Sequence, residues 1–216
     1  MTTTPQAPEP TPGGQAPRRA RRADARRNEQ ALLDAAAAVF VTHGVDAPVR
    51  LVAAEAGVGM GTIYRHFPTR AELVVAVYRH QVEALAEAGP ALLAEEADPA
   101  DALRRWAAGF VEFLVTKHGL AGVLGADEGA GALHRYFVER LAPVCDALLD
   151  AAVGPLDSGR VPGVMLMRGI GNLSIGGRDG SGYDAARMAD LLVAGVLARG
   201  SASDAGAGSD LASAAR

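Results

Sequence analysis

Glycine and proline recur within residues 44–68 at intervals too short for a long helix. The positions that matter most are Gly44, Pro48, Gly57, Gly59 and Pro68. Glycine favours left-handed turn conformations, and proline cannot continue a helix from the residues before it. The stretch therefore predicts two short helices, over residues 49–56 and 60–66, joined by a tight turn at 57–59. Any fold for this chain has to pack this short pair against the segments on either side.

The flanking segments carry apolar residues at intervals of three and four, which is the spacing of an amphipathic helix. Alanine dominates the composition, hydrophobic residues make up 49% of the chain, and aromatic residues only 5%. Alanine and leucine have high helix propensities, so we expect an all-α fold. Further helices are predicted over residues 25–43, 70–87, 99–117, 132–153 (with a kink at Pro143), 161–173 and 183–199. The glycine-rich residues 119–131 are expected to hold one short helix.

The two ends of the chain differ in composition from the middle. The first 17 residues are rich in Pro, Thr, Gly and Gln, and six arginines follow closely: Arg18, Arg19, Arg21, Arg22, Arg26 and Arg27. Such segments bury too little apolar surface to offset the entropy lost on ordering. We expect residues 1–24 to form a disordered basic arm and residues 200–216 a disordered tail.

Charge is distributed unevenly along the chain, whose net charge is −4. Residues 1–80 hold ten Lys/Arg and seven Asp/Glu, whereas residues 81–216 hold eleven and eighteen. A basic front and an acidic rear indicate that only the front meets a polyanion such as DNA, although charge alone leaves chance scatter open. The arginines of the arm are either a solvated tail or a segment that neutralises phosphates and enters a minor groove.

Residue patterns typical of catalysis or metal binding are not found. The five histidines form no pair at i, i+4 spacing, and there is no Gly-x-Ser-x-Gly elbow. A single cysteine, Cys145, excludes an intrachain disulfide and a cysteine-based zinc site. Its apolar neighbours predict an inert buried thiol, with redox sensing as the alternative. We expect no catalytic residues, no metal and no cofactor.

The sequence also gives an expectation about the compartment. No stretch approaches the roughly 20 apolar residues of a membrane span. The arginines near the N-terminus are not followed by the apolar segment of a secretory signal. We therefore expect a soluble, cytoplasmic protein without membrane contact.

A longer helix followed by two short ones has the layout of a helix-turn-helix unit. Such a unit places its second helix in the major groove of DNA and braces it with the first. In this chain the second helix spans residues 60–66, and Ile63 and Phe67 are expected to face inward. The residues expected on the outer side are Thr62, Tyr64, Arg65 and His66.

The run that contains these helices carries a more specific signal. It is Val49-Arg-Leu-Val-Ala-Ala-Glu-Ala-Gly-Val-Gly-Met-Gly-Thr-Ile-Tyr-Arg-His-Phe-Pro-Thr-Arg-Ala-Glu-Leu73. This run closely resembles the signature of the TetR family of transcriptional regulators, Ile-Ala-x-x-Ala-Gly-Val-Ser-x-Gly-Thr-x-Tyr-x-His-Phe-x-x-Lys-x-x-Leu, and the similarity extends over residues 26–80. The departures are Gly59 for a capping serine, Pro48 for a capping threonine and Arg70 for a lysine.

The resemblance implies DNA contacts at eight residues of this chain. They are Arg50, Met60, Gly61, Thr62, Tyr64, Arg65, His66 and Arg70. Tyr64 and Arg70 are expected at phosphates, and Arg50 is a further phosphate candidate. Thr62 and Arg65 are expected to approach base edges, while the remaining three lie near the groove.

The resemblance also implies the organisation of the whole chain. A helix-turn-helix DNA-binding domain over residues 25–70 precedes a helical ligand-binding and dimerisation domain over residues 71–199. The last two long helices are expected to form a homodimer, although they would otherwise complete one subunit's core. Their apolar stripes are Met165, Leu166, Ile170 and Leu173, then Met188, Leu191, Leu192 and Val196. The implied function is repression from a palindromic operator on double-stranded DNA, controlled by an unknown small-molecule effector.

Five aromatic residues of the rear domain are candidates for lining the effector pocket. They are Trp106, Phe110, Phe113, Tyr136 and Phe137. Plain core packing is the alternative for each of them. An alternative function is a helix-turn-helix regulator whose C-terminal domain binds a protein partner and no small molecule. A shielded, polar-lined cavity favours the ligand, and a well-packed core with an exposed apolar patch favours the partner.

Overall fold

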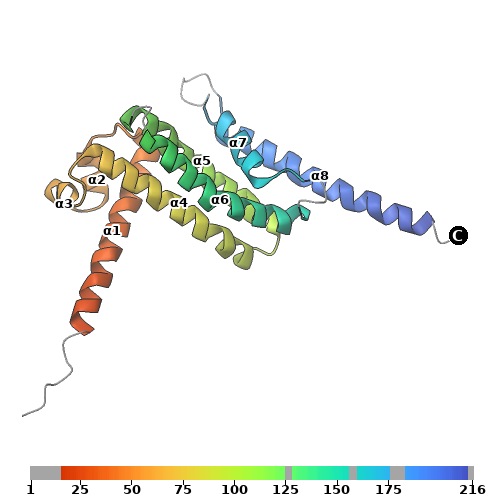
Figure 1. The fold of residues 1–216 in the computed structure, drawn as a ribbon, viewed down its shortest axis with the longest axis horizontal. Coiled ribbons are helices and arrows are strands. Elements are labelled where there is room, and N and C mark those ends of the chain that lie inside the picture. Colours follow the sequence, from red (N-terminus) through yellow and green to blue (C-terminus); the bar gives the residue numbers. More distant parts are fainter. Residues whose placement is uncertain (1–15, 125–127, 156–159, 176–182, 214–216) are drawn as a thin grey trace, which may run out of the picture.

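The computed structural model describes residues 16–124, 128–155, 160–175 and 183–213. Within these ranges the chain forms helices and no strands, which confirms the all-α fold. The helices are α1 (Ala16–His43), α2 (Val49–Glu55), α3 (Met60–His66), α4 (Arg70–Glu95), α5 (Pro99–Leu124), α6 (Glu128–Val153), α7 (Gly163–Leu173) and α8 (Ala185–Ser213). Figure 1 shows α2 and α3 together at one end, beside α1 and the start of α4. Helices α7 and α8 lie toward the other end, with α4, α5 and α6 between.

The short helices α2 and α3 are held by a core that they share with α1 and α4. Its buried residues include Leu32, Ala36, Val39, Phe40, Val52, Ile63, Val74 and Val77. Helix α1 ends at His43, the next residue, Gly44, has a φ of +77°, and the turn between α2 and α3 passes through Gly57, whose φ is +65°. Both angles are in the left-handed region that favours glycine, so the turns predicted at these glycines are confirmed.

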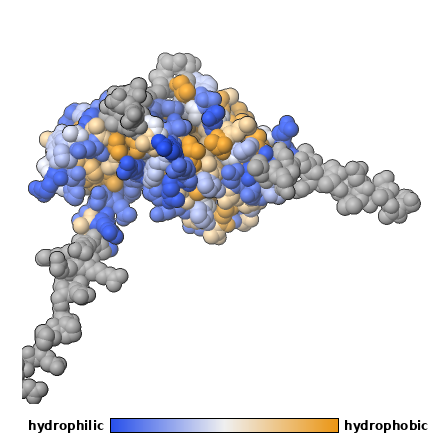
Figure 2. Space-filling model, in the orientation of Figure 1, coloured by the Kyte–Doolittle hydropathy of each residue, from blue (hydrophilic) through white to orange (hydrophobic). Residues whose placement is uncertain are grey.

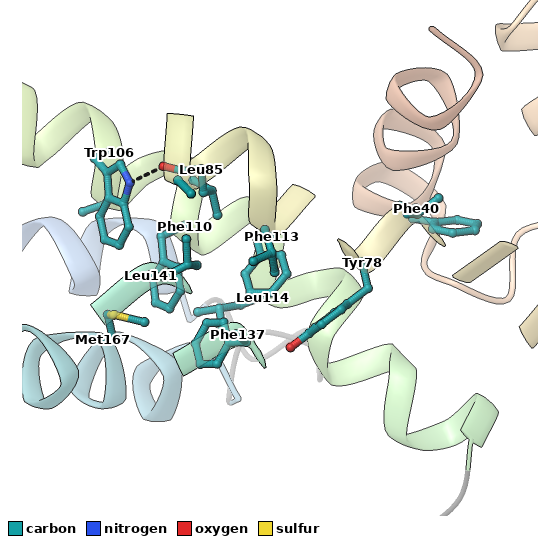
Figure 3. Packing of buried hydrophobic residues seen from close by; sticks show 14 of the residues in the cluster. Phe40, Tyr78, Leu85, Trp106, Phe110, Phe113, Leu114, Phe137, Leu141 and Met167 are labelled. Atoms are coloured by element: carbon teal, nitrogen blue, oxygen red, sulfur yellow. Dashed lines mark hydrogen bonds between the residues drawn. The ribbon is translucent and has the colours of Figure 1, made fainter. Parts of the chain in front are cut away.

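The rear of the molecule has an aromatic core between α4, α5, α6 and α7 (Figure 3). Trp106 stacks on Phe110 with a centroid separation of 5.4 Å, and its Nε1 donates a 2.9 Å hydrogen bond to the carbonyl of Leu85. Phe113 lies 6.0 Å from Phe110 and 5.6 Å from Phe137. These contacts join three long helices into one bundle, because apolar area and ring geometry both favour such packing.

Several helices are longer than the sequence predicted. Helix α1 begins at Ala16 and not near residue 25, α4 ends at Glu95 and not at 87, and α5 runs to Leu124 and not 117. The prediction of a separate short helix within 119–131 is wrong, because α5 and α6 cover most of that stretch. Helix α8 continues to Ser213, through most of the stretch that the sequence analysis expected to be a disordered tail. Residues 1–15 of the expected arm lie outside the described residues.

Helix α4 shows why one of these ends was misplaced. Pro90 lies inside α4 on an exposed position, so its ring does not interrupt a buried contact. The residue before it, Gly89, is buried against α6, where an added Cβ would lie 2.2 Å from Cγ1 of Val144. The close approach of α4 and α6 at Gly89 stabilises the helix on both sides of the proline, so tertiary packing overrides the local signal to stop.

A buried guanidinium fixes the start of α7 to α6. Arg160, whose side chain is 4% exposed, donates to Asp146 (Nη1–Oδ1 3.0 Å) and to Asp150 (Nε–Oδ1 2.8 Å). The same Oδ1 of Asp146 accepts a 2.8 Å hydrogen bond from the backbone N–H of Gly163, the first residue of α7. Charge-assisted hydrogen bonds of this kind are strong and directional. They hold α7 in place along the cavity described below.

Among the described residues, no helix is long and apolar enough to cross a membrane.

Candidate nucleic-acid interface and rear cavity

The side chains of α3 divide into an inner and an outer set. Ile63 is 1% exposed, and Phe67 just after the helix is also buried. Met60 and Tyr64, by contrast, are 50% and 47% exposed. Large side chains with so much exposed surface contribute little to the core and remain available to a partner.

The eight residues predicted to contact DNA have the exposure that such contacts require. Six of them are exposed: Arg50, Met60, Gly61, Tyr64, Arg65 and His66. Thr62 and Arg70 are half-buried. A Cβ at Gly61 would meet open space, so the backbone of α3 is accessible there. Their contacts with DNA remain predictions.

Arg70 has a structural partner that the sequence did not suggest. Its Nη2 donates a 2.6 Å hydrogen bond to the carbonyl of Ala47 and a second hydrogen bond to the carbonyl of Val45. Both carbonyls belong to the turn between α1 and α2, so the first residue of α4 fixes the turn that precedes the short helices. A phosphate contact would have to use the remaining N–H groups of the guanidinium.

The short helices begin without side-chain caps. Pro48 occupies the N-cap of α2 and Gly59 the N-cap of α3, and neither makes a side-chain cap hydrogen bond. The missing cap that the sequence predicted at Gly59 is therefore confirmed. The N–H groups of the first turn of each helix therefore receive no acceptor from a capping side chain.

Helix α4, in contrast, begins with a complete capping box that the sequence analysis missed. Thr69 Oγ1 accepts a 3.2 Å hydrogen bond from the N–H of Glu72, and Glu72 Oε2 accepts one of 2.9 Å from the N–H of Thr69. The Thr-x-x-Glu spacing directly after Pro68 was the available signal. This box fixes where α4 begins and therefore where Arg70 lies.

The five aromatic candidates for the rear pocket have different surroundings. Trp106 and Phe113 are buried in the core and do not line the cavity described below. Tyr136 is half-buried, and its hydroxyl donates a 2.5 Å hydrogen bond to Oε1 of Glu83. Only Phe110 and Phe137 border that cavity.

The Glu83 carboxylate links α4 to α6 at the edge of this region. Arg140 donates a 2.8 Å hydrogen bond from Nε to Oε1 of Glu83. Hydrogen bonds from Arg140 and Tyr136 lower the pKa of Glu83 to about 2. Burial and the hydrogen bond to Glu83 raise the pKa of Tyr136 to about 12. The tyrosine is therefore a fixed, neutral donor at physiological pH.

A cavity of about 350 Å³ lies between α5, α6 and α7. Its apolar lining is Phe110, Leu114, Phe137, Val138, Val164, Met167 and Ile175. Its basic or titratable lining is Lys117, His118, His134 and Arg168, and its other members are Gly171 and Asn172. The volume is within the range of small-molecule sites. The sequence analysis missed the basic residues, although Phe110, Leu114 and Lys117 share one helical face.

Cys145 is fully buried in α6. Burial and, to a lesser degree, the nearby Asp146 raise the pKa of its thiol to about 12. The thiol is therefore protonated at neutral pH, and a protonated, inaccessible thiol reacts poorly with oxidants. This supports the inert role that the sequence predicted over redox sensing.

The two apolar stripes near the end of the chain are only partly used within one subunit. Leu166 and Ile170 of α7 are buried, whereas Met165 on the same helix is 59% exposed. On α8, Leu191 is 56% exposed and Met188 is also exposed. Figure 2 shows apolar residues at the surface where Figure 1 places α7 and the start of α8.

Together, these features define a class of protein: a helix-turn-helix DNA-binding unit joined to a helical bundle with a cavity between α5, α6 and α7. The sequence of residues 32–77 matches the family model described as bacterial regulatory proteins, tetR family. A TetR transcriptional regulator from Streptomyces coelicolor is 32% identical with a TM-score of 0.62, and the match covers 78% of this chain and 97% of that one. The chain belongs to the TetR family of transcriptional regulators.

Two further solved structures are similar. A TetR regulatory protein from Mycobacterium vanbaalenii is 29% identical with a TM-score of 0.52, over 85% of this chain and 97% of that one. The regulator FadR from Bacillus subtilis, solved in complex with stearoyl-CoA, shares the fold at 17% identity, with a TM-score of 0.50 over 77% of this chain and 96% of that one. The chain is thus a DNA-binding transcriptional regulator by family.

Proposed function

We propose that this protein is a sequence-specific repressor that binds a palindromic operator as a homodimer and is released by a small-molecule effector. The observation that carries the proposal is the outer side of α3, where Met60 and Tyr64 are about half exposed while Ile63 is buried. A helix with an apolar inner side and a free polar and aromatic outer side suits insertion into a major groove. Arg65 and Thr62 would read bases, and Tyr64 would contact phosphate.

Dimerisation through α7 and α8 is supported by the apolar side chains that one subunit leaves exposed. Met165, Met188 and Leu191 lie on these two helices. Covering them with the same surface of a second copy gives a twofold interface, as most homodimers have. A twofold dimer would present its two α3 helices to major grooves about 34–36 Å apart, which requires a palindromic site.

A small-molecule effector is supported over a protein partner by the cavity between α5, α6 and α7. It combines an apolar wall with a few polar groups, which is the usual composition of a ligand site. The similarly folded FadR was solved with a bound ligand, stearoyl-CoA. The exposed apolar residues, which would favour a protein partner, would be covered by the second subunit proposed above.

Helix α5 contacts both the cavity and the turn that precedes α2. Lys117 and His118 line the cavity, and the next residue, Gly119, packs so closely on the turn before α2 that an added Cβ would lie 2.4 Å from Cγ2 of Val45. The carbonyl of Val45 accepts a hydrogen bond from Arg70 at the start of α4. A ligand that shifts α5 or α4 would therefore alter the position of α2 and α3, provided that it binds the two states with different affinity.

The test is a fluorescence-anisotropy titration of the protein on its own upstream DNA and on random DNA, across a series of salt concentrations. We expect tight binding selective for the upstream DNA, with a steep salt dependence from phosphate neutralisation. Equal, weak binding to both DNAs would contradict an operator in that region. For the effector, a ligand that saturates the protein without changing operator affinity would contradict the coupling.

We also propose that the protein is located in the cytoplasm, because its function requires access to DNA.

A further inference from the structure

The cavity between α5, α6 and α7 has an unbalanced charge. Lys117 of α5 and Arg168 of α7 line it together with His118 and His134, and no carboxylate is among its described lining residues. Neither Lys117 nor Arg168 takes part in any of the ion pairs between described residues, which join arginines or a histidine to carboxylates elsewhere. Cations that border a partly buried cavity without a counter-charge attract an anion strongly.

Lys117 is partly removed from water without a carboxylate among the described lining residues to balance its charge. Its ammonium is half-buried and lies 5.5 Å from the centroid of the Phe137 ring, which gives a cation–π contact in place of an ion pair. Burial lowers the pKa of Lys117. An anion in the cavity would supply the missing charge partner.

Much of the remaining lining of the cavity is apolar and includes the rings of Phe110 and Phe137, which stack at a centroid separation of 5.9 Å. Such a wall favours burial of hydrocarbon and disfavours a small, fully hydrated ion such as free phosphate. The volume of about 350 Å³ suits a compact molecule.

We propose that the effector is an organic anion with one acidic group and a compact apolar body. Lys117 and Arg168 hold the acidic group, and Phe110 and Phe137 line the site of the apolar body. This inference rests on the proposed function, in which the rear domain binds a small effector, and it assigns the chemical class of that effector.

His134 makes the binding of such an anion depend on pH. Burial and the charges of Lys117 and Arg168 lower the pKa of His134, which favours its neutral form. Lys117 and Arg168, the two charges that act on it, line the same cavity, and so does His118. A bound anion favours the protonated form, so binding takes up a proton, and affinity increases as the pH falls.

The test uses octanoate as the probe and octanamide as its neutral counterpart of similar size. Trp106 is the single tryptophan of the chain and stacks on Phe110 of the cavity wall, so its fluorescence reports entry, with calorimetry as a second readout. We expect octanoate to bind on the order of tenfold more tightly than octanamide, because charge-assisted hydrogen bonds are stronger than neutral ones. We also expect a further gain for octanoate, and none for octanamide, as the pH is lowered.

The double variant Lys117→Met, Arg168→Gln should abolish the preference for octanoate while keeping octanamide binding. The matched control Arg187→Gln removes an exposed arginine of α8 outside the cavity. It should change neither the preference for octanoate nor the binding of octanamide. Equal or tighter binding of octanamide to the unchanged protein overturns the proposal, and so does a failure of both probes to bind. The operator titration is independent of these outcomes, so a failure here does not count against DNA binding, and a loss of operator binding does not count against the ligand class.

Discussion

Tyr64 on α3 leaves 47% of its surface exposed, whereas Trp106 and Phe110 on α5 are buried and stacked on each other. Trp106 also donates a hydrogen bond to the carbonyl of Leu85 of α4. The helices that carry them also differ. Helix α3 has seven residues and no side-chain cap, whereas α5 has 26 residues packed against several neighbours. A helix of seven residues is unstable alone in water. The stability of α2 and α3 therefore depends on packing against α1 and α4 and on the turn between α1 and α2. The bundle of α4 to α7, in contrast, is stabilised by its own core.

The largest effect that this comparison predicts is on stability at the rear. Phe113 is buried, with ring contacts to Tyr78 at 5.3 Å and to Phe110 and Phe137. Phe113→Ala should lower the free energy of unfolding by about 3–5 kcal/mol, because it removes apolar contacts and leaves a cavity. The measurement is urea unfolding followed by circular dichroism. The matched front-end variant, Tyr64→Ala, should change stability by no more than about 0.5 kcal/mol while weakening DNA binding. Similar losses of stability in the two variants would refute the contrast.

A smaller effect on stability is expected at Arg70, which connects α4 to the turn between α1 and α2. Arg70→Ala leaves the carbonyls of Val45 and Ala47 without their donor and should lower stability by about 1–3 kcal/mol, and operator affinity with it. Arg70→Lys keeps the charge but not the planar guanidinium that reaches both carbonyls. If lysine retains operator affinity, Arg70 acts mainly on phosphate. If lysine weakens binding as much as alanine does, Arg70 acts by positioning the turn.

The same contrast explains how much the sequence predicts. The helix-turn-helix unit is encoded within one contiguous run, so Gly44, Gly57 and the inward position of Ile63 follow from local turn chemistry and helical spacing. Arg70 illustrates the limit, because its carbonyl partners lie 23 and 25 residues earlier in the chain. No local pattern indicates such a distant pairing.

The cavity is even harder to predict from local sequence patterns. Lys117, His134 and Arg168 come from three helices, and only their packing brings them to one cavity. Sequence reasoning selected five aromatic residues as lining candidates, but the fold uses Trp106 and Phe113 as core. Residue type alone does not distinguish an aromatic that borders a cavity from one that fills the core, since both are apolar and occur at helical spacing.

On α3 itself the comparison can be sharpened by separating two kinds of DNA contact. Arg65→Ala should cost about 1–3 kcal/mol of operator binding and relax the preference at one base-pair position. Tyr64→Phe removes a hydroxyl and should weaken binding to operator and random DNA by similar, smaller factors. Anisotropy on a set of single-substitution operators measures both. An Arg65→Ala variant with equal losses on every DNA would make Arg65 a phosphate contact.

The smallest effect concerns the missing cap of α3. Gly59 is in an extended conformation with φ −73° and ψ 147°, and an added Cβ there would meet nothing within 4 Å. Serine fits this geometry, and its hydroxyl can accept from a free N–H of the first turn. Gly59→Ser should raise the free energy of unfolding by a few tenths of a kcal/mol, measured by urea unfolding. Gly59→Ala adds the same Cβ without the acceptor and serves as the control. If alanine stabilises as much as serine, the gain comes from reduced freedom of the unfolded chain and not from capping.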